Sequence, residues 1–538
     1  MDDGTRLAGL VPSYLDLRWH MDPVAATAQG LTEHDGRLGD FTTDSVRLHV
    51  VALKSLASSL EAATSDSIDD EIDRTALLND VRVTIHRFTK ETPHVTDPGF
   101  WLTHVLEGLY HLLALTDRPR EHRARAARER LEAIPRFLDQ AQATLGECPP
   151  VFVDTALSIV GGGRLLLDQV AEQLRPPEED GFPEIVGRAR AALEAFARYM
   201  TDDLRRSDGA AFAVGEDAFN FRLHYEHALR DTAPELWRYG THLAEEVERD
   251  LVRLGKEIDP SVSWPDLVDR LRANHPPAPA LVAAYASEMD RAKEFVEQKE
   301  LVAIPPGPLD VVETPAFLKP LMPFAAYQPP GAFSSDRTGR FFVTPPDGEV
   351  DPAAVERILR DHCVHELAST SLHEAYPGHH LQFLTALAQP RVVRQVVGTA
   401  LTIEGWALYC EEMMGEEGFY RGPEERFFQR VHLLWRAVRI ILDVGLHTRG
   451  MTFDEAVQML VDRVHFDRQN AEAKIKRYCA TPGYQLCYAI GQQKFRSLRD
   501  SFREAQGSAY SLRGFHDAAL KYGGLPVSLI RWGMGLDE

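Results

Sequence analysis

The chain has 538 residues, of which 44% are hydrophobic and 26% charged, a composition typical of globular proteins. Asp and Glu outnumber Lys and Arg by 81 to 59, which gives a net charge of −22. Because nucleic acids and anionic membrane surfaces are bound through a basic footprint, this charge argues against both as partners.

The first residues and the cysteines indicate the compartment. Residues 1–6 contain neither a basic n-region nor an apolar h-region, and the sequence has no run of 18 apolar residues. We therefore expect no signal peptide, no membrane span and a cytoplasmic location. The five cysteines are scattered and odd in number, without a Cys-x-x-Cys pair, so a disulfide framework and a thiolate zinc site are both disfavoured.

The hydrophobic spacing divides the chain into three segments. Residues 1–300 have helical spacing almost throughout and predict an N-terminal helical half. In the segment 301–350, Leu301 to Pro305 predicts a short strand, and the runs 324–331 and 336–344 predict a β-hairpin. The C-terminal helical half, residues 351–538, has expected helices at about 352–388, 391–415, 421–449, 453–465, 468–480 and 484–505. The predicted fold is mainly α, a large multi-helix protein with a small antiparallel hairpin or sheet, in which the three segments form one intertwined domain.

The densest group of potential metal ligands lies in the C-terminal half. His373, Glu374, His379 and His380 fall within eight residues, and Glu404 follows a helix later. Imidazole and carboxylate together are the ligands of catalytic Zn²⁺ sites. Zinc peptidases usually carry His-Glu-x-x-His on one helix, where two histidines four residues apart bind the ion and the glutamate is the general base.

The spacing in this chain departs from that motif, because the residue four positions after His373 is Pro377. On a regular helix His380 faces the same way as His373, but about 10 Å further along the axis, too far for both to bind one ion. Pro377 and the glycine after it can interrupt a helix. We therefore predict a break or bulge at 376–378 that brings His379 beside His373.

The residues 373–382, His-Glu-Ala-Tyr-Pro-Gly-His-His-Leu-Gln, resemble the signature of a large bacterial family known only as domain of unknown function 885. Residues 402–409 and 481–491 are similar to later blocks of that family. Residues 14–31 and 324–346 also look familial, so the resemblance covers nearly the whole chain.

That family in turn resembles the helical zinc peptidases of the angiotensin-converting, thimet-oligopeptidase and Taq-carboxypeptidase type. These carry His-Glu-x-Gly-His and a downstream glutamate ligand on a second helix. With the Gly-His pair kept in register, the resemblance implies a zinc-peptidase-like cleft and one Zn²⁺ bound by His373, His379 and Glu404. His380 is the alternative to His379, and Glu374 is the expected general base.

The resemblance also implies donors for the oxyanion that forms on an attacked carbonyl. Tyr484 and Tyr488, four residues apart, are the candidates, with His465 as a weaker one. Arg477 is a candidate for binding a substrate carboxylate through its planar fork.

Four further residues have an ordinary structural interpretation. Glu411 and Glu412 are expected on a solvated helix face, with orientation of a ligand histidine as the alternative. His362 and His365 precede a glutamate that never completes a zinc motif, so we expect them to be structural.

The function expected from these residues is a metal-dependent hydrolase that cleaves short peptides with a zinc-activated water. Two alternatives stay open. One is a hydrolase of a non-peptide amide or a small metabolite conjugate, and the other is a non-catalytic protein with a degenerate metal site.

Overall fold

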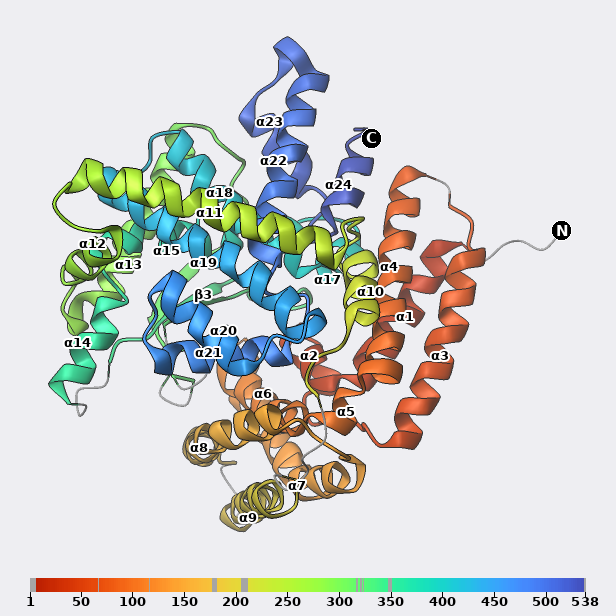
Figure 1. Ribbon diagram of the computed structural model, residues 1–538. Coiled ribbons are helices and arrows are strands. Elements are labelled where there is room, and N and C mark those ends of the chain that lie inside the picture. The colour runs from red at the N-terminus through yellow and green to blue at the C-terminus, as the bar shows by residue number, and fades with distance from the viewer. Residues whose placement is uncertain are drawn as a thin grey trace. The chain divides into compact units, whose positions relative to one another are not determined.

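The computed structural model describes residues 6–65, 67–115, 117–176, 181–204, 211–315, 318–319, 322, 324–346 and 351–536 (Figure 1). Most of these residues are helical, so the predicted mainly-α fold is confirmed. Contacts divide the chain into two compact units. The first comprises 1–214, 315–321 and 330–337, and the second comprises 215–314, 322–329 and 338–538.

The first unit is built from helices packed in pairs. They are α1 (Leu7–Met21), α2 (Pro23–Ala28), η1 (Thr32–His34), α3 (Thr43–Ala62), α4 (Ile68–His86), η2 (Arg87–Glu91), α5 (Pro93–Thr96), α6 (Pro98–Ala114), α7 (Arg120–Thr144), α8 (Pro150–Gln173) and α9 (Phe182–Asp202). Helix α7 packs against α6 and α9, and α3 packs against α1 and α4. In the core, the buried guanidinium of Arg130 donates to the carbonyl oxygens of Arg37 and Gly108 and to the hydroxyl of Thr27. These contacts tie the loop after α2 to α6 and α7.

Among the described residues, helix α8 is the one that is long and apolar enough to cross a membrane by length and composition alone. A third of its most apolar window, 33%, is buried inside the protein. One such helix is weak evidence for a membrane span, because core helices pass the same test.

The second unit contains the remaining helices and the sheet. Its helices are α10 (Glu216–Tyr225), α11 (Ala233–Ile258), α12 (Trp264–Arg272), η4 (Ala278–Ala280), α13 (Leu281–Gln298), α14 (Pro352–Arg360), α15 (Val364–Glu374), α16 (His379–Leu387), α17 (Val392–Val396), α18 (Ala400–Glu416), α19 (Pro423–Thr448), α20 (Phe453–Met459), η5 (Leu460–Val464), α21 (Arg468–Ala480), α22 (Cys487–Gln506), η6 (Gly507–Ala509), α23 (Leu512–Leu520) and α24 (Val527–Gly533). Helix α19 is buried along most of its length and packs against α11, α15, α21 and α22. Figure 1 shows α11 running alongside it.

The sheet of the second unit has three strands, β1 (Leu309–Glu313), β2 (Ala325–Gln328) and β3 (Gly339–Val343), in the order β1-β3-β2. Strands β2 and β3 pair antiparallel, which confirms the predicted hairpin. Strand β1 pairs parallel with β3, so the sheet is mixed and not purely antiparallel as predicted.

The strand predicted at Leu301 to Pro305 is wrong, because neighbouring helices use the polar backbone groups of this segment. The Leu301 N–H donates to the carbonyl of Val296 and so closes the end of α13, and the Leu301 carbonyl accepts from His516. The Ala303 N–H donates to the carboxylate of Asp517. The strand that pairs with β3 in the sheet is β1, which lies later in the chain.

Two expected long helices are divided. The segment 352–388 forms α14, α15 and α16, and the segment 391–415 forms α17 and α18. Between α17 and α18, Gly398 leaves the helical path to form a β-bridge with Gly524. This contact between residues far apart in sequence has no local signal.

Helices α18 and α22 approach each other at a glycine on each side. A Cβ built on Gly405 would overlap the backbone of Gly491, and a Cβ on Gly491 would overlap the carbonyl oxygen of Leu401. Only hydrogen atoms fit between the two backbones here. The close approach brings together the helix that carries Glu404, α18, and the helix that carries Tyr488, α22.

We predict that Gly405→Ala lowers the free energy of unfolding by about 1–3 kcal/mol, because backbone atoms on α22 must shift to admit the methyl group. The matched control is Gly187→Ala, on an exposed face of α9 with nothing within 4 Å of the new Cβ. That control is expected to be neutral or stabilising by about 0.5–1 kcal/mol, since alanine favours helix. Denaturant unfolding measures both variants, and equal effects would contradict the assigned contact.

Candidate metal centre

The helix that carries His373 is interrupted where the sequence predicts. Helix α15 ends at Glu374 and α16 begins at His379, and the Tyr376–Pro377 peptide between them is cis. The break at 376–378 is therefore confirmed. His379 is the first residue of a new helix and does not lie further along the axis of α15. Its ring therefore lies beside that of His373, with the two ring centroids 4.8 Å apart.

The break is held by close backbone contacts and by α18. The Gly378 N–H donates to the carbonyl of Leu372 at 3.0 Å, and a Cβ on Gly378 would overlap that carbonyl oxygen. On the other side, the indole N–H of Trp406 donates to the carbonyl of Pro377 at 2.8 Å. The polar backbone group freed by the break is thus satisfied inside the protein.

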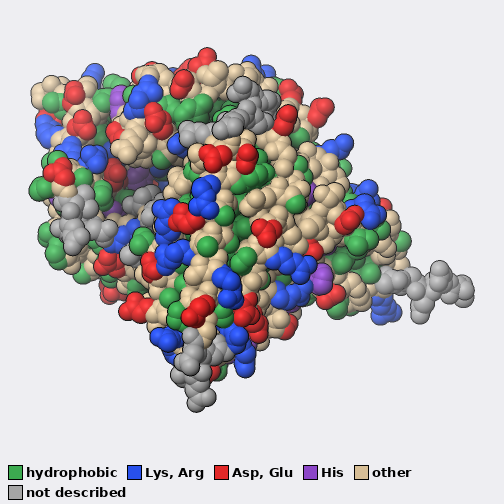
Figure 2. Space-filling view, turned by 90° about the horizontal axis from the view of Figure 1, so that it is seen from below, with side chains coloured by type: hydrophobic (Ala, Val, Ile, Leu, Met, Phe, Trp, Pro, Cys, Tyr) green, Lys and Arg blue, Asp and Glu red, His purple; other side chains and the backbone are tan. Residues whose placement is uncertain are grey.

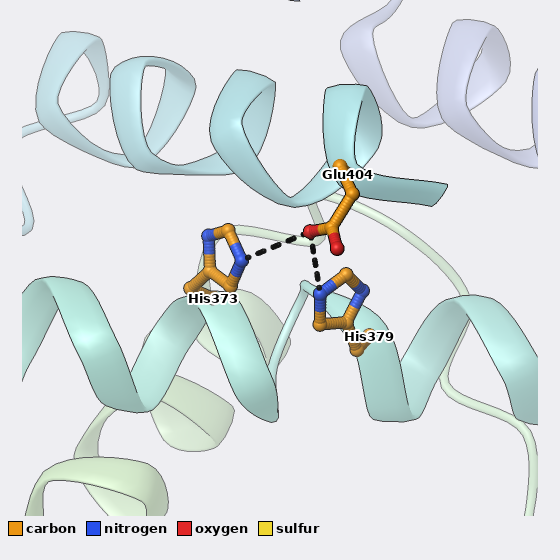
Figure 3. Close-up of side chains that lie close together, drawn as sticks. All are labelled: His373, His379 and Glu404. Carbon is orange, nitrogen blue, oxygen red and sulfur yellow. Dashed lines mark ion pairs between the residues drawn. The ribbon is translucent and has the colours of Figure 1, made fainter. Parts of the chain in front are cut away.

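Three side chains converge at this break, as Figure 3 shows. The Oε2 atom of Glu404 lies 3.7 Å from Nε2 of His373 and 3.4 Å from Nε2 of His379. The ligand atoms of the three residues all lie within 4.8 Å of one another. In a tetrahedral zinc site with ligands about 2.0–2.1 Å from the ion, neighbouring ligands are about 3.3 Å apart. The donor set fits one Zn²⁺, and the two distances to Glu404 are close to that spacing.

The ring of His373 is fixed on its other side by Glu411. Nδ1 of His373 lies 2.8 Å from Oε1 of Glu411. An ionised carboxylate only accepts, so Nδ1 carries the proton and Nε2 faces Glu404. Burial would lower the pKa of His373, but the nearby carboxylate of Glu404 and the bond to Glu411 raise it to about 10. Metal binding at Nε2 therefore displaces a proton.

The solvated position expected for Glu411 is wrong. Glu411 is buried and lies on the same face of α18 as Glu404, which precedes it by seven residues. It bonds the ring of His373, as the alternative interpretation of Glu411 expected. Glu412 points elsewhere and accepts from Gln492. Nδ1 of His379 is buried and has no hydrogen-bond partner among the described residues, so only one of the two ligand rings is supported in this way.

The second oxygen of Glu404 accepts from two tyrosines. The hydroxyl groups of Tyr484 and Tyr488 donate to Oε1 at 2.5 and 2.9 Å. Burial would raise the pKa of Glu404, but the imidazoles of His373 and His379 hold it well below its usual value. Burial and the nearby Glu404 raise the pKa of Tyr488 to about 12, and the same two causes raise the pKa of Tyr484 well above its usual value. Both tyrosines therefore stay neutral donors at physiological pH.

His380, the alternative ligand, lies outside the group of three. Its Nδ1 is 3.0 Å from the hydroxyl of Tyr327 on β2, and burial lowers its pKa to about 4. The ring of Tyr327 also lies parallel to that of His379, with centroids 6.5 Å apart. Sequence reasoning missed Tyr327, because nothing local links β2 to α16.

The other candidates fall into two groups. Glu374, directly after His373, is half-buried, and its charge helps to raise the pKa of His373. Arg477 is exposed, with its guanidinium 5.7 Å from the ring of Tyr484. His465 stacks edge-on with Trp264 and contacts none of the three converging residues.

His362 and His365 have the structural surroundings expected for them. His362 bonds the hydroxyl of Tyr285 and stacks on Phe324, and His365 stacks on Phe428. Neither belongs to the group of three potential ligands.

A buried carboxylate on α19 fixes the turn that carries Tyr484. The two oxygens of Asp443 accept from the backbone N–H groups of Gly483 and Leu486 at 3.0 and 3.1 Å. Gly483 has a φ of 80°, which glycine adopts without strain. Burial raises the pKa of Asp443 to about 7 despite these bonds. Tyr484 thus lies in a turn before α22, not inside the helix expected from residue 484.

Comparisons place the chain among proteins without an assigned activity. The family model described as "Bacterial protein of unknown function (DUF885)" matches residues 23–534. No curated protein matches the chain.

Two solved structures share the fold. One, "a putative lipoprotein of unknown function from Shewanella oneidensis", is similar with a TM-score of 0.82 and 23% identity, over 98% of this chain and 100% of that one. The other, "the putative lipoprotein from Colwellia psychrerythraea", has a TM-score of 0.83 and 16% identity, over 98% of each chain. The word lipoprotein applies to those two proteins, and the cytoplasmic location of this chain stays a prediction.

We predict that Glu411→Ala weakens zinc binding by about 10- to 100-fold, because His373 loses the acceptor that fixes its ring. Competition with a chromophoric chelator measures the affinity. The matched control is Glu412→Ala, the next residue on α18, which is expected to bind zinc as the unaltered chain does. An equal loss in both variants would show that Glu411 has no particular role.

Proposed function

Because this chain belongs to the bacterial family DUF885, as residues 373–382 predicted, and the description of that family assigns no activity, we propose its function from the metal centre itself. The proposed function is metal-dependent hydrolysis of a peptide or related amide bond in a short substrate. The observation that carries this proposal is the convergence of His373, His379 and Glu404, with Glu374 next to His373 in the chain.

The donor set supports zinc in particular. Two neutral imidazoles and one carboxylate leave a fourth tetrahedral position free for water or substrate, as in catalytic zinc sites. Zinc bound there supplies Lewis acidity and brings the pKa of water to about 7. The bond from Glu411 to His373 is the kind of support that ligand histidines have in such sites.

Glu374 is the proposed general base. It is the first residue after the proposed ligand His373, it is half-buried, and its charge helps to raise the pKa of both His373 and Tyr327. Its carboxylate would take a proton from the attacking water and pass it to the leaving amine. A glutamate directly after the first histidine has this role in His-Glu zinc motifs.

Tyr484 and Tyr488 are the proposed donors to the oxyanion. Their hydroxyls meet at one oxygen of Glu404 and lie 3.3 Å from each other. Because both tyrosines keep their protons at neutral pH, they can donate to a negative charge that develops next to the ligand carboxylate. Each hydroxyl has one proton, so in the reaction it would turn that proton from Glu404 toward the oxyanion.

The similarity to helical zinc peptidases supports a peptide substrate. The chain resembles them in a His-Glu pair, a Gly-His pair and a glutamate ligand on a second helix, here with two residues inserted before Gly378. By this resemblance the centre would lie in a cleft that admits short peptides.

We predict that Glu374→Gln keeps zinc but lowers kcat for peptide hydrolysis by about 10²- to 10⁴-fold, because the amide cannot accept the proton. Zinc content by atomic absorption and hydrolysis of a mixed short-peptide library measure the two properties. A variant that retains zinc and full activity would remove Glu374 as the base. Activity of the unaltered chain on amide metabolites and on no peptide would favour the non-peptide alternative.

We predict that His379→Ala abolishes stoichiometric zinc binding, whereas His380→Ala, its immediate neighbour, retains one zinc ion per chain. The reason is that His379 supplies a converging nitrogen and His380 bonds Tyr327 instead. Calorimetric titration with Zn²⁺ measures both. If His380→Ala loses zinc and His379→Ala keeps it, His380 is the ligand instead of His379. An unaltered chain that binds no Zn²⁺, Mn²⁺ or Co²⁺ would favour a degenerate site.

A further inference from the structure

Four basic side chains gather beside the metal centre: Arg436 and Arg439 on α19, and Lys474 and Arg477 on α21. The ring of Trp435 organises three of them. Its centroid lies 4.9 Å from the guanidinium carbon of Arg436, 5.2 Å from that of Arg439 and 4.5 Å from Nζ of Lys474. This group is called the basic cluster below.

The cluster shares the two tyrosines of the metal centre. The guanidinium of Arg439 lies 3.9 Å from the ring centroid of Tyr488, and that of Arg477 lies 5.7 Å from the ring of Tyr484. The hydroxyls of the same tyrosines bond Glu404. Tyr484 and Tyr488 therefore contact both the basic cluster and the proposed ligand Glu404.

The positive charge of the cluster is poorly balanced within the protein. The nearest carboxylate of Arg436 is Glu411, at 4.0 Å, and Arg439 donates to the neutral Gln485. In the described part of the chain, Lys474 and Arg477 have no ion pair within 4.0 Å and their side chains make no hydrogen bond.

Several basic residues elsewhere in the second unit are paired with carboxylates. Arg499, for example, pairs with Glu416 at 2.6 Å, and Arg272 pairs with Glu366 at 3.2 Å. On the face shown in Figure 2, basic side chains lie among acidic ones. Among the described residues, by contrast, Arg439, Lys474 and Arg477 have no carboxylate within 4.0 Å, and Arg436 has one at that limit.

Burial increases the free-energy cost of the positive charge in the cluster. Arg436 and Arg439 are 9% and 5% exposed, and the Nε atom of each is buried without a hydrogen-bond partner among the described residues. Burial, with Arg439 as the next cause, lowers the pKa of Lys474 to about 8, although Asp361 opposes this. Buried cations whose charge is only partly compensated destabilise a fold, and an anionic ligand would relieve that cost.

We propose that Arg436, Arg439, Lys474 and Arg477 form a subsite that binds a carboxylate of the substrate. The inference rests on the proposed hydrolase and names its substrate class: short peptides or amides with a free carboxylate near the cleaved bond. Planar guanidinium forks match a carboxylate, and the rings of Trp435, Tyr488 and Tyr484 lie beside the guanidinium groups of the cluster. Two groups carry such a carboxylate, the C-terminus of a peptide and an acidic side chain.

The first experiment compares three N-acylated peptides with the zinc-loaded full chain. One has a free C-terminus, one is amidated and neutral, and one is amidated with Glu next to the cleaved bond. We expect kcat/KM for the first or the third peptide to exceed that of the neutral one by at least about 10-fold, as charge-assisted hydrogen bonds predict. Whichever peptide is preferred identifies the source of the carboxylate. Equal values for all three would overturn the subsite.

The second experiment removes charge from the cluster. The double variant Lys474→Gln, Arg477→Gln is expected to reduce the preference for the carboxylate peptide by about 10-fold, mainly through KM. Arg439→Lys keeps the charge but loses the fork, and it is expected to reduce the preference as well. The matched control is Arg496→Gln, an exposed arginine on α22 that lies 3.6 Å from Glu412, and it should keep the full preference. Zinc content is measured in every variant, and an unchanged preference in zinc-loaded cluster variants would overturn the subsite.

A binding measurement separates this inference from the hydrolase proposal. N-acetylglycine and its neutral amide are titrated calorimetrically into the full chain, with zinc and after chelation. The subsite predicts binding of the carboxylate and not of the amide, in both states, and loss of that binding in the double variant. If no peptide is cleaved but this pattern holds, the hydrolase proposal fails and the subsite stands. Binding that requires zinc and persists in the double variant would assign the carboxylate to the metal and overturn the subsite.

Discussion

The arrangement of the centre depends on one constraint, the interruption between α15 and α16. An unbroken helix would place the second histidine along the axis, away from His373, whereas the break lets His379 begin a new helix at the same level. The hydrogen bond from Trp406 to the Pro377 carbonyl anchors the break to α18. Because α18 also carries Glu404, the contact that stabilises the break aligns the third potential ligand with the two histidines.

Helix α18 holds the ring of His373 at both nitrogens. Glu404 and Glu411 are seven residues apart, two helical turns, and so lie on one face. The first approaches Nε2 and the second bonds Nδ1. Two buried carboxylates on one face repel each other unless positive charge lies between them, and the imidazole supplies it. This explains why the pKa of His373 rises although its ring is buried, and why the pKa values of both glutamates fall.

The confirmed prediction of the helix break rests on residues that are neighbours in the sequence. Pro377 and its neighbouring glycine indicate a break without any knowledge of the rest of the fold, and the position of His379 follows from it.

The residues that were mispredicted or missed act through contacts between distant segments. The seven-residue spacing from Glu404 to Glu411 was a usable signal for a shared face, but which face is buried depends on α15. Arg436 and Arg439 lie on a largely apolar helix, and only the packing of α21 and α22 around it brings them to the tyrosines. The parallel pairing of β1 likewise has no local pattern.

Helix α19 connects the candidate metal centre to the basic cluster. Arg436, Arg439 and Asp443 lie at intervals of three and four residues and so share one face. Asp443 fixes the turn before α22 through two backbone N–H groups, which sets the position of Tyr484, and Arg439 packs on the ring of Tyr488. One rigid buried helix therefore positions both the hydroxyls that meet Glu404 and the cations behind them. A carboxylate bound at the cations would be held at a constant distance from the three potential ligands. In the proposed hydrolase, this would let an anionic group on the substrate select the bond that is cleaved.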